Sequence, residues 1–431
     1  MWNRFIILKA RKVKIFTKTI LKSYGVDMNC RKVHIFDMYL FTTIVLLTLS
    51  SCKAVIGTKM ESILLYVGYF FLLGGIYISY LRLTRKYRRK FIDKFALILA
   101  VLFSVGILVQ NLTIKRKLIL LFTMAAILMT STMAENFIKD YRNIRSMAYG
   151  CIWGVIASII ICLACGEPLW GNATEGTLGI YWFFNGGIKD KNIATIMLAM
   201  IISLYIYGKH YGRFRQLDRV MIVIGLLIII LSNSRGAWIH TLVFFVMMNC
   251  EKVYMIRKNQ RKLFTVGITI AGLVIAYFLY DKVILQSSTY LFRYRGLANY
   301  LSMFGSDSYH MWLGNAEIAY DKDLGYVNTI RSITGWNGSL EIAWLNILIK
   351  NGLLGAIGFI IIFAKFFYVA LKSDNVLNQA FCISLTVMLI VTSLVATYIQ
   401  TVHSLFGIYC YMLISFFIGM EHKNYPKKHG G

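Results

Sequence analysis

The chain has 431 residues, of which 58% are hydrophobic and 15% are charged, and its mean hydropathy is +0.62. Soluble domains carry about 45–50% apolar and about 25% charged residues, so this composition excludes an ordinary soluble enzyme. The net charge of +28 does not indicate nucleic-acid binding, because the basic residues cluster in short segments between apolar runs. There the expected partners of Lys and Arg are anionic head groups of membrane lipids.

The first 34 residues are basic and mildly amphipathic, and they predict a cytoplasmic or interfacial arm. Twelve apolar runs follow, most of them close to the length that crosses a hydrocarbon core of about 30 Å. In lipid such runs must be helices, since every backbone amide needs a partner within the segment. The runs cover residues 35–56, 62–81, 95–111, 118–134, 147–166, 191–208, 219–232, 236–250, 263–281, 349–370, 379–399 and 402–420.

We therefore expect an all-α polytopic membrane protein with about 12 transmembrane helices and a long extracytoplasmic loop between helices 9 and 10. Helices 1–9 occupy residues 35–281, the loop residues 282–348, helices 10–12 residues 349–420, and a cytoplasmic tail residues 421–431. With both termini in the cytoplasm, the cytoplasmic segments hold roughly two thirds of the 47 Lys and Arg residues.

A first long outer loop, at residues 167–190, follows a CxxC pattern formed by Cys162 and Cys165. On a membrane helix we interpret this cysteine pattern as small-residue packing rather than as a redox pair. The loop is rich in aromatic residues, among them Trp170 and Trp182. Such residues suit either the rings of bound sugars or the membrane interface, and both interpretations stay open.

Ser234, Arg235 and Gly236 separate two apolar runs that would form a helix of about 45 Å if they were joined. Because this length exceeds the bilayer, we expect two short helices that meet at a tight turn. Arg235 then either snorkels to lipid phosphate or holds a diphosphate as a fixed guanidinium. Arg293 and Arg295, expected on the same side, are either solvated or part of the same anion site.

The second long loop, residues 282–348, mixes aromatic residues with Asn and Asp, which again suits sugars or the interface. Asp321 and Asp323 form either a solvated turn or a carboxylate pair for a hard cation. Glu341 stands in the expected first turn of a helix, where the dipole favours a carboxylate, and it is also a candidate general base. A glycine-rich break at Gly352 then precedes a full apolar span.

Taken together, Ser234-Arg235-Gly236-Ala237, an Arg soon after the next run, the long outer loop and the stretch from Asn337 to Gly355 resemble the family of O-antigen ligases and polysaccharide repeat-unit polymerases. The resemblance covers roughly residues 180–431. It implies a membrane glycosyltransferase that needs no metal or other cofactor. Its donor would be an oligosaccharide on undecaprenyl diphosphate, outside the bacterial cytoplasmic membrane.

The resemblance implies that Arg235, and Arg293 or Arg295, hold the diphosphate of the donor, and ten residues in all are candidates for the site. The catalytic candidates are Arg235, Arg293, Arg295, Glu341 and His310, and the substrate-binding candidates are Ser234, Trp312, Trp336, Asn337 and Arg331. Ligases of the family typically carry a His before the Asn, where this chain has Trp336, so we favour a polymerase of O-antigen, capsule or exopolysaccharide units. The alternatives are a ligase-type transferase and a flippase or transporter of lipid-linked oligosaccharides. The implied protein partners are a flippase and a chain-length regulator of the same pathway.

Overall fold

The computed structural model describes residues 35–83, 94–177, 180–189, 192–249, 288–318 and 342–424, together with residues 266, 267, 270, 274 and 277. The predicted basic arm, most of the apolar run 263–281 and residues 425–431 lie outside the described residues. The same holds for the candidates Arg331, Trp336, Asn337 and Glu341, for the Asp321–Asp323 pair and for the side chain of Arg293.

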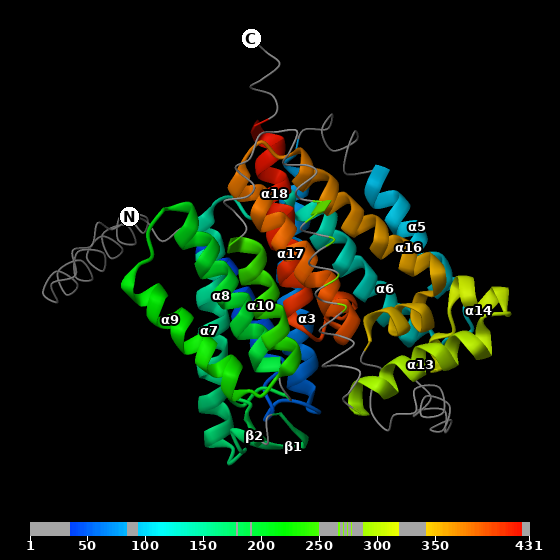
Figure 1. Cartoon of the computed structure of the whole chain (residues 1–431), viewed down its shortest axis with the longest axis horizontal. Coiled ribbons are helices and arrows are strands. Elements are labelled where there is room, and N and C mark those ends of the chain that lie inside the picture. Colours follow the sequence, from blue (N-terminus) through cyan, green and yellow to red (C-terminus); the bar gives the residue numbers. More distant parts are fainter. Residues whose placement is uncertain are drawn as a thin grey trace, which may run out of the picture.

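The described residues form a helical bundle in which successive long helices run in opposite directions (Figure 1). Eleven of the predicted apolar runs each coincide with one helix, which fits a backbone that must satisfy its own polar groups in lipid. These helices are α2 (Ile35–Leu49), α3 (Lys59–Leu81), α5 (Lys94–Val109), α6 (Ile114–Leu128), α7 (Tyr141–Ala164), α8 (Asn192–His210), α9 (Gln216–Leu231), α10 (Arg235–Asn249), α16 (Ala343–Lys372), α17 (Val376–Val395) and α18 (Leu405–Asn424).

Six of the described helices are long and apolar enough to cross a membrane, namely α3, α6 with its continuation to Asn136, α7, α8, α16 and α17. Three further apolar helices, α2, α5 and α18, are shorter. The chain is thus a mainly helical protein with several potential membrane spans, while the count of twelve stays a prediction.

The exterior of the bundle is apolar, as a lipid-facing surface must be. Large hydrophobic side chains point outward from α3, α5, α7 and α9, including Phe70, Leu97, Ile160 and Leu227. Soluble monomers rarely expose apolar patches of such extent, so these side chains are suited to contact with lipid. The helices α8, α17 and α18 lie in the interior, where nearly all their described side chains are buried.

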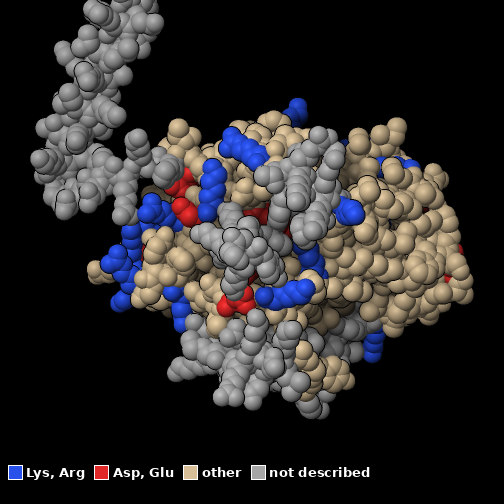
Figure 2. All heavy atoms as spheres, turned by 90° about the horizontal axis from the view of Figure 1, so that it is seen from above, with Lys and Arg blue, Asp and Glu red and all other residues tan. Residues whose placement is uncertain are grey.

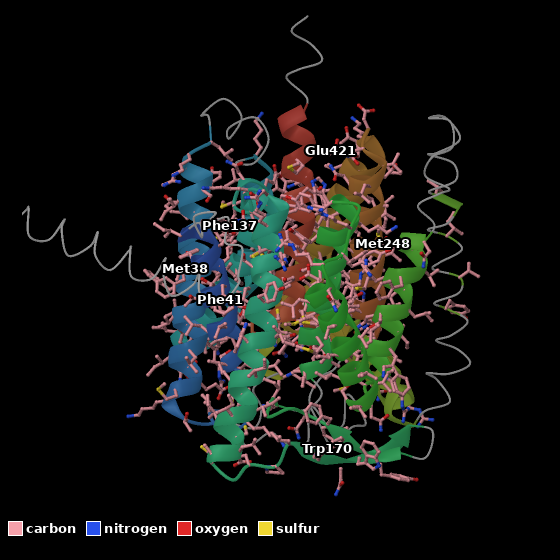
Figure 3. All side chains as sticks on the ribbon, turned by 90° about the vertical axis from the view of Figure 1, so that its left-hand side faces the viewer. Met38, Phe41, Phe137, Trp170, Met248 and Glu421 are labelled. Carbon is pink, nitrogen blue, oxygen red and sulfur yellow. The ribbon has the colours of Figure 1, made fainter. Side chains whose placement is uncertain are left out.

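The two ends of the bundle differ in the segments that they carry. One end, here called the hairpin end, carries β1 (Trp170–Thr177) and β2 (Ile180–Phe184), whereas α18 finishes at the opposite end (Figure 1). Side-chain positions follow this division, since Trp170 and Glu421 lie at opposite ends (Figure 3). At the α18 end, Lys and Arg gather with acidic residues among them (Figure 2). The exposed basic residues in the connections and first helical turns at this end include Arg82, Lys139, Arg142, Arg215 and Arg219.

The strands β1 and β2 differ from the all-α expectation, because they pair as an antiparallel hairpin within the predicted loop 167–190. Trp170 pairs with Phe184 in the register, and the two ring centroids lie 5.1 Å apart. The Trp182 ring lies 5.2 Å from that of Trp170. Cross-strand aromatic contacts of this kind stabilise a hairpin, so these aromatic residues build local structure in the loop.

The helix α6 continues through a π-helical turn, η2 (Met129–Met133), into a short 3-10 helix, η3 (Ala134–Asn136). The Ser415 hydroxyl of α18 donates to the Thr130 carbonyl of η2 over 2.8 Å. The buried Glu135 carboxylate of η3 pairs with Lys365 Nζ of α16 at 2.9 Å. Two polar links therefore fasten α6 to the C-terminal helices within an apolar bundle.

The predicted break in α16 is confirmed, because Gly352 has a φ of 65° and a ψ of −166° inside the helix. The helix begins at Ala343, before the predicted run at residue 349, since the apolar residues Leu345 and Ile349 extend it. These residues form a small separate core with Ile342, Tyr300 and Ile318. The loop 282–348 is consequently helical in part, with α13 (Ser288–Phe304) and α14 (Ser308–Leu313) packed against the first half of α16.

Gln110, at the end of α5, satisfies the backbone around this break. Its amide nitrogen donates to the carbonyl oxygens of Leu313 and Lys350 at 2.5 and 3.0 Å, and its amide oxygen accepts from Ala316 N at 2.7 Å.

Gly314, with a φ of 85°, lies against Gly352, so two glycines with positive φ meet where the segment after α14 crosses α16.

We expect Gly352→Ala to destabilise the protein strongly. An added Cβ would lie 2.3 Å from the carbonyl oxygen of Trp312, and the backbone region is one that essentially only glycine adopts. The strain alone amounts to about 1–3 kcal/mol. The measurement is thermal unfolding in detergent, with Gly74→Ala as the control, since no atom lies within 4 Å of a Cβ there. Equal midpoints for both variants would contradict the break as described.

Candidate functional site

The predicted turn between α9 and α10 is confirmed, and it places Arg235 at the first position of α10. The helix α9 ends at Leu231, and Asn233 adopts a φ of 49°, the left-handed conformation that Asn tolerates after a helix end. The indole Nε1 of Trp238 donates to the Ile229 carbonyl oxygen over 3.0 Å. The Ile229 carbonyl is one of the last four of α9, which have no partner within the helix, and this bond gives it one.

Arg235 and Ser234 are half-buried at the hairpin end, beside the start of α10. Arg295 lies exposed on α13, and Trp312 is exposed on α14. The helix α14 packs against α16 and α5, whereas α10 packs mainly against α17 (Figure 1). The structure thus places the α14 candidates and Arg235 on different flanks of α16 and α17, and it does not gather them in one site.

His310 is oriented by a carboxylate. Asp307 caps α14 by accepting hydrogen bonds from the backbone nitrogens of Tyr309 and His310 at 3.0 and 3.2 Å. Its other oxygen, Oδ2, contacts His310 Nδ1, and these bonds to His310 hold the Asp307 pKa below its usual value. Because Nδ1 is engaged, Nε2 is the ring nitrogen that can exchange a proton with a ligand. Asp307 therefore holds the His310 imidazole in one orientation, but the two residues lie on the α14 flank and not beside Arg235.

Two buried residues that the sequence did not single out lie at the same end as Arg235. His240 of α10 is 0% exposed, and Gln400, in the connection between α17 and α18, is 3% exposed. Among the described residues, neither ring nitrogen of His240 and neither amide atom of Gln400 has a hydrogen-bond partner. Burial of such groups without partners is costly, so each case needs an explanation such as a ligand or water.

Ring contacts link α10 to the connection that carries Gln400 by way of Phe406 in α18. The His240 ring stacks on the Phe406 ring with centroids 6.1 Å apart, and Phe406 in turn contacts Tyr398 at 6.0 Å. The connection is fixed in place by two buried tyrosines of the bundle, since the Tyr411 and Tyr69 hydroxyls donate to the Ile399 and Val402 carbonyls at 2.9 and 2.7 Å. These contacts give His240 and Gln400 a rigid setting.

His403 extends the group toward the end of the bundle. The positive charges of Lys350 and Lys189 act on its ring, as does the opposite charge of Glu61. Desolvation by the surrounding chain, together with the two lysines, lowers the pKa of His403 below its ordinary value, although Glu61 acts against this shift. The imidazole is therefore neutral near pH 7 and can accept a proton.

We use the name hairpin-end polar cluster for five residues at this end of the bundle, Arg235, His240, Lys350, Gln400 and His403. Of these, His403 and Lys350 interact electrostatically, and Arg235 and His240 lie in the first two turns of α10. The cluster combines cationic groups with buried polar atoms that have no described partner. The signal in the sequence that leads to it is the pair of helix breaks at Asn233 and Gly352, because these breaks place α10 and Lys350 at the same end. Among the described residues, no group of three or more His, Cys, Asp or Glu side chains is arranged to hold a metal ion.

The described part of the chain is thus mainly helical, with several helices long and apolar enough to cross a membrane and with ionisable and buried polar side chains at one end of the bundle. Compared with known proteins, the chain matches no protein-family model and no curated protein.

The environment of His403 gives a pH test of the cluster. We expect Lys189→Gln to raise the pKa of His403, because it removes a positive charge, and Glu61→Gln to lower it, because it removes a negative charge. The pKa is measured by NMR of imidazole-labelled protein in detergent, with His403→Gln used to identify the resonance. Shifts in the same direction for both variants would refute the charge arrangement.

Proposed function

We propose that the protein is a polymerase of lipid-linked oligosaccharide repeat units, as in the synthesis of O-antigen, capsule or exopolysaccharide. In this proposal it lies in the bacterial cytoplasmic membrane, with both termini in the cytoplasm and the hairpin end outside. The donor is an oligosaccharide on undecaprenyl diphosphate, and the acceptor is a sugar hydroxyl of a second glycan. Membrane lipids surround the bundle, and a flippase and a chain-length regulator of the same pathway are its expected protein partners.

The observation that carries the proposal is the position of the hairpin-end polar cluster. Its cationic groups stand at one end of an apolar bundle, with Arg235 at the first position of α10 and Lys350 near His403, and in this proposal the head group of a lipid carrier lies at that end. Ionisable residues within apolar helices are costly, and they usually mark functional sites. The unpartnered atoms of His240 and Gln400 are donors and acceptors of the kind that bind sugar hydroxyls.

The chemistry needs few protein groups. A diphosphate leaving group requires no acid, but its charge must be stabilised, and fixed cations in a partly dry site do this well. Arg235 supplies a guanidinium that binds phosphate oxygens in pairs, and Lys350 supplies a second charge. The transition state resembles an oxocarbenium ion, as in other glycosyl transfers.

The remaining step is removal of the proton from the acceptor hydroxyl. A positioned base typically contributes about 10²–10⁴-fold to the rate. We assign this step to His403, because its side chain is exposed in the connection between α17 and α18, near Lys350, and its lowered pKa leaves the imidazole able to accept a proton. The earlier candidate His310 is oriented by Asp307 but stands on the α14 flank, and Glu341 lies outside the described residues.

The alternatives are a ligase-type transferase and a flippase or transporter. Analysis of carrier-linked glycans in a deletion strain separates the three. Loss of a polymerase leaves single repeat units at the surface, and loss of a ligase leaves polymer on undecaprenyl diphosphate. Loss of a flippase traps single units at the cytoplasmic face.

We expect Arg235→Ala and Arg235→Lys to abolish polymer formation without loss of the protein from the membrane. Removal of one group that stabilises transition-state charge typically costs about 10²–10³-fold, and lysine does not bind phosphate bidentately. The control is Lys115→Ala, which removes an exposed cation at the same end. Polymer is measured by glycan electrophoresis, and wild-type polymer in either Arg235 variant would exclude this role.

A second pair of variants tests whether the buried polar groups serve function rather than stability. We expect Gln400→Leu to leave the unfolding midpoint unchanged or higher, because an unpaired buried amide costs about 1–3 kcal/mol, and to reduce polymer formation. Gln110→Leu is the matched control, since that buried amide has three backbone partners and its loss should destabilise. If Gln400→Leu lowers the midpoint as much as Gln110→Leu does, Gln400 is structural.

A further inference from the structure

Two cysteines far apart in the chain meet at the hairpin end. Cys52 follows α2, Cys162 lies in the last turn of α7, and their sulfur atoms are 3.7 Å apart. Both residues are 0% exposed. The CxxC partner of Cys162 in the sequence, Cys165, is instead exposed beyond the helix end. Cys162 thus lies beside a thiol that the sequence pattern did not indicate.

Backbone contacts hold together the segments around the two cysteines. Cys52 forms an isolated antiparallel bridge with Ile188, and the backbone nitrogens of Lys53 and Lys189 donate to the Gly187 and Ser51 carbonyls at 2.7 and 2.8 Å. Gly187 lies directly on Cys162, since an added Cβ would come within 2.9 Å of the Cys162 sulfur. Three segments of the chain therefore converge on the two thiols.

We propose that Cys52 and Cys162 form a disulfide bond in the mature protein. A disulfide requires a sulfur separation of about 2.05 Å, so the two side chains need only a small rotation, with the backbone kept in place by the contacts around it. The proposal shares with the proposed function the orientation that puts the hairpin end outside the cytoplasmic membrane. Disulfides form and persist in that compartment, whereas cytoplasmic thiols stay reduced.

The oxidation is a thiol–disulfide exchange with a protein disulfide of the cell envelope. The thiolate of one cysteine attacks the disulfide of the oxidant and forms a mixed disulfide. The thiolate of the second cysteine then attacks the first sulfur and releases the oxidant as a dithiol. Two thiol protons and two electrons leave this chain in total. Because both sulfurs are buried in the folded protein, the exchange takes place before residues 185–189 close over Cys162.

In the test, membranes are dissolved in denaturing detergent at low pH together with the alkylating reagent, so that buried free thiols are accessible and are alkylated before digestion with trypsin under non-reducing conditions. We expect mass spectrometry to detect the peptide that ends at Lys53 joined to the peptide that ends at Lys189, two hydrogens lighter than the separate pair. Fragmentation assigns the link to Cys162 rather than to Cys151 or Cys165. Alkylated Cys52 and Cys162, or a Cys162–Cys165 link, would overturn the proposal.

A stability measurement provides a second readout. We expect reductant to lower the unfolding midpoint of the wild-type protein but to leave that of the Cys52→Ser/Cys162→Ser variant unchanged. Cys410→Ser is the control for replacement of a buried cysteine, and this variant should keep the response to reductant. A wild-type protein insensitive to reductant would count against the bond.

Labelling of Cys165 separates this inference from the proposed function. In intact cells, a membrane-impermeant maleimide should modify the exposed Cys165 if the hairpin end is outside. If Cys165 is labelled while Cys52 and Cys162 carry free thiols, the disulfide proposal fails and the orientation stands. If the disulfide is present but Arg235→Ala still makes polymer, the proposed function fails alone.

Discussion

Every backbone polar group within an apolar bundle needs a partner, and the side chain of Gln110 meets this constraint at the place where the bundle is least regular. Its side-chain amide forms hydrogen bonds with the backbone of Leu313 and Ala316, at and after the end of α14, and with the backbone of Lys350 in α16. Because these groups are satisfied, α16 can break at Gly352 and α14 can lie against it. The Gln110 side chain thus adds hydrogen bonds to the apolar packing that holds α14 beside α5 and α16.

The break at Gly352 and the break at Asn233 act together. Each interrupts what would be a continuous helix, so polar groups come to lie at helix ends. The first places Lys350 near His403, and the second places Arg235 and His240 in the first two turns of α10. A cationic site is thus built from helix ends, while the outer surface of the helices remains apolar.

Much of this arrangement follows from the sequence by simple physics. The apolar runs predicted the helices, the limited thickness of a bilayer predicted the turn between α9 and α10, and Gly352 predicted the break in α16. The hairpin β1–β2 was missed because its aromatic residues are equally typical of a membrane interface. His240 and Gln400 were missed because a single polar residue within an apolar run has no motif, and its meaning depends on neighbours that only the fold supplies.

The ion pair between Glu135 and Lys365 has a consequence for biogenesis. Its members are 230 positions apart, so the carboxylate is synthesised and threaded into the bilayer long before its ammonium partner exists. Removal of one member of a buried ion pair typically costs about 3–5 kcal/mol. The final packing of η3 therefore includes a contact that can form only after α16 has been made, which ties the assembly of the N-terminal helices to that of the C-terminal ones.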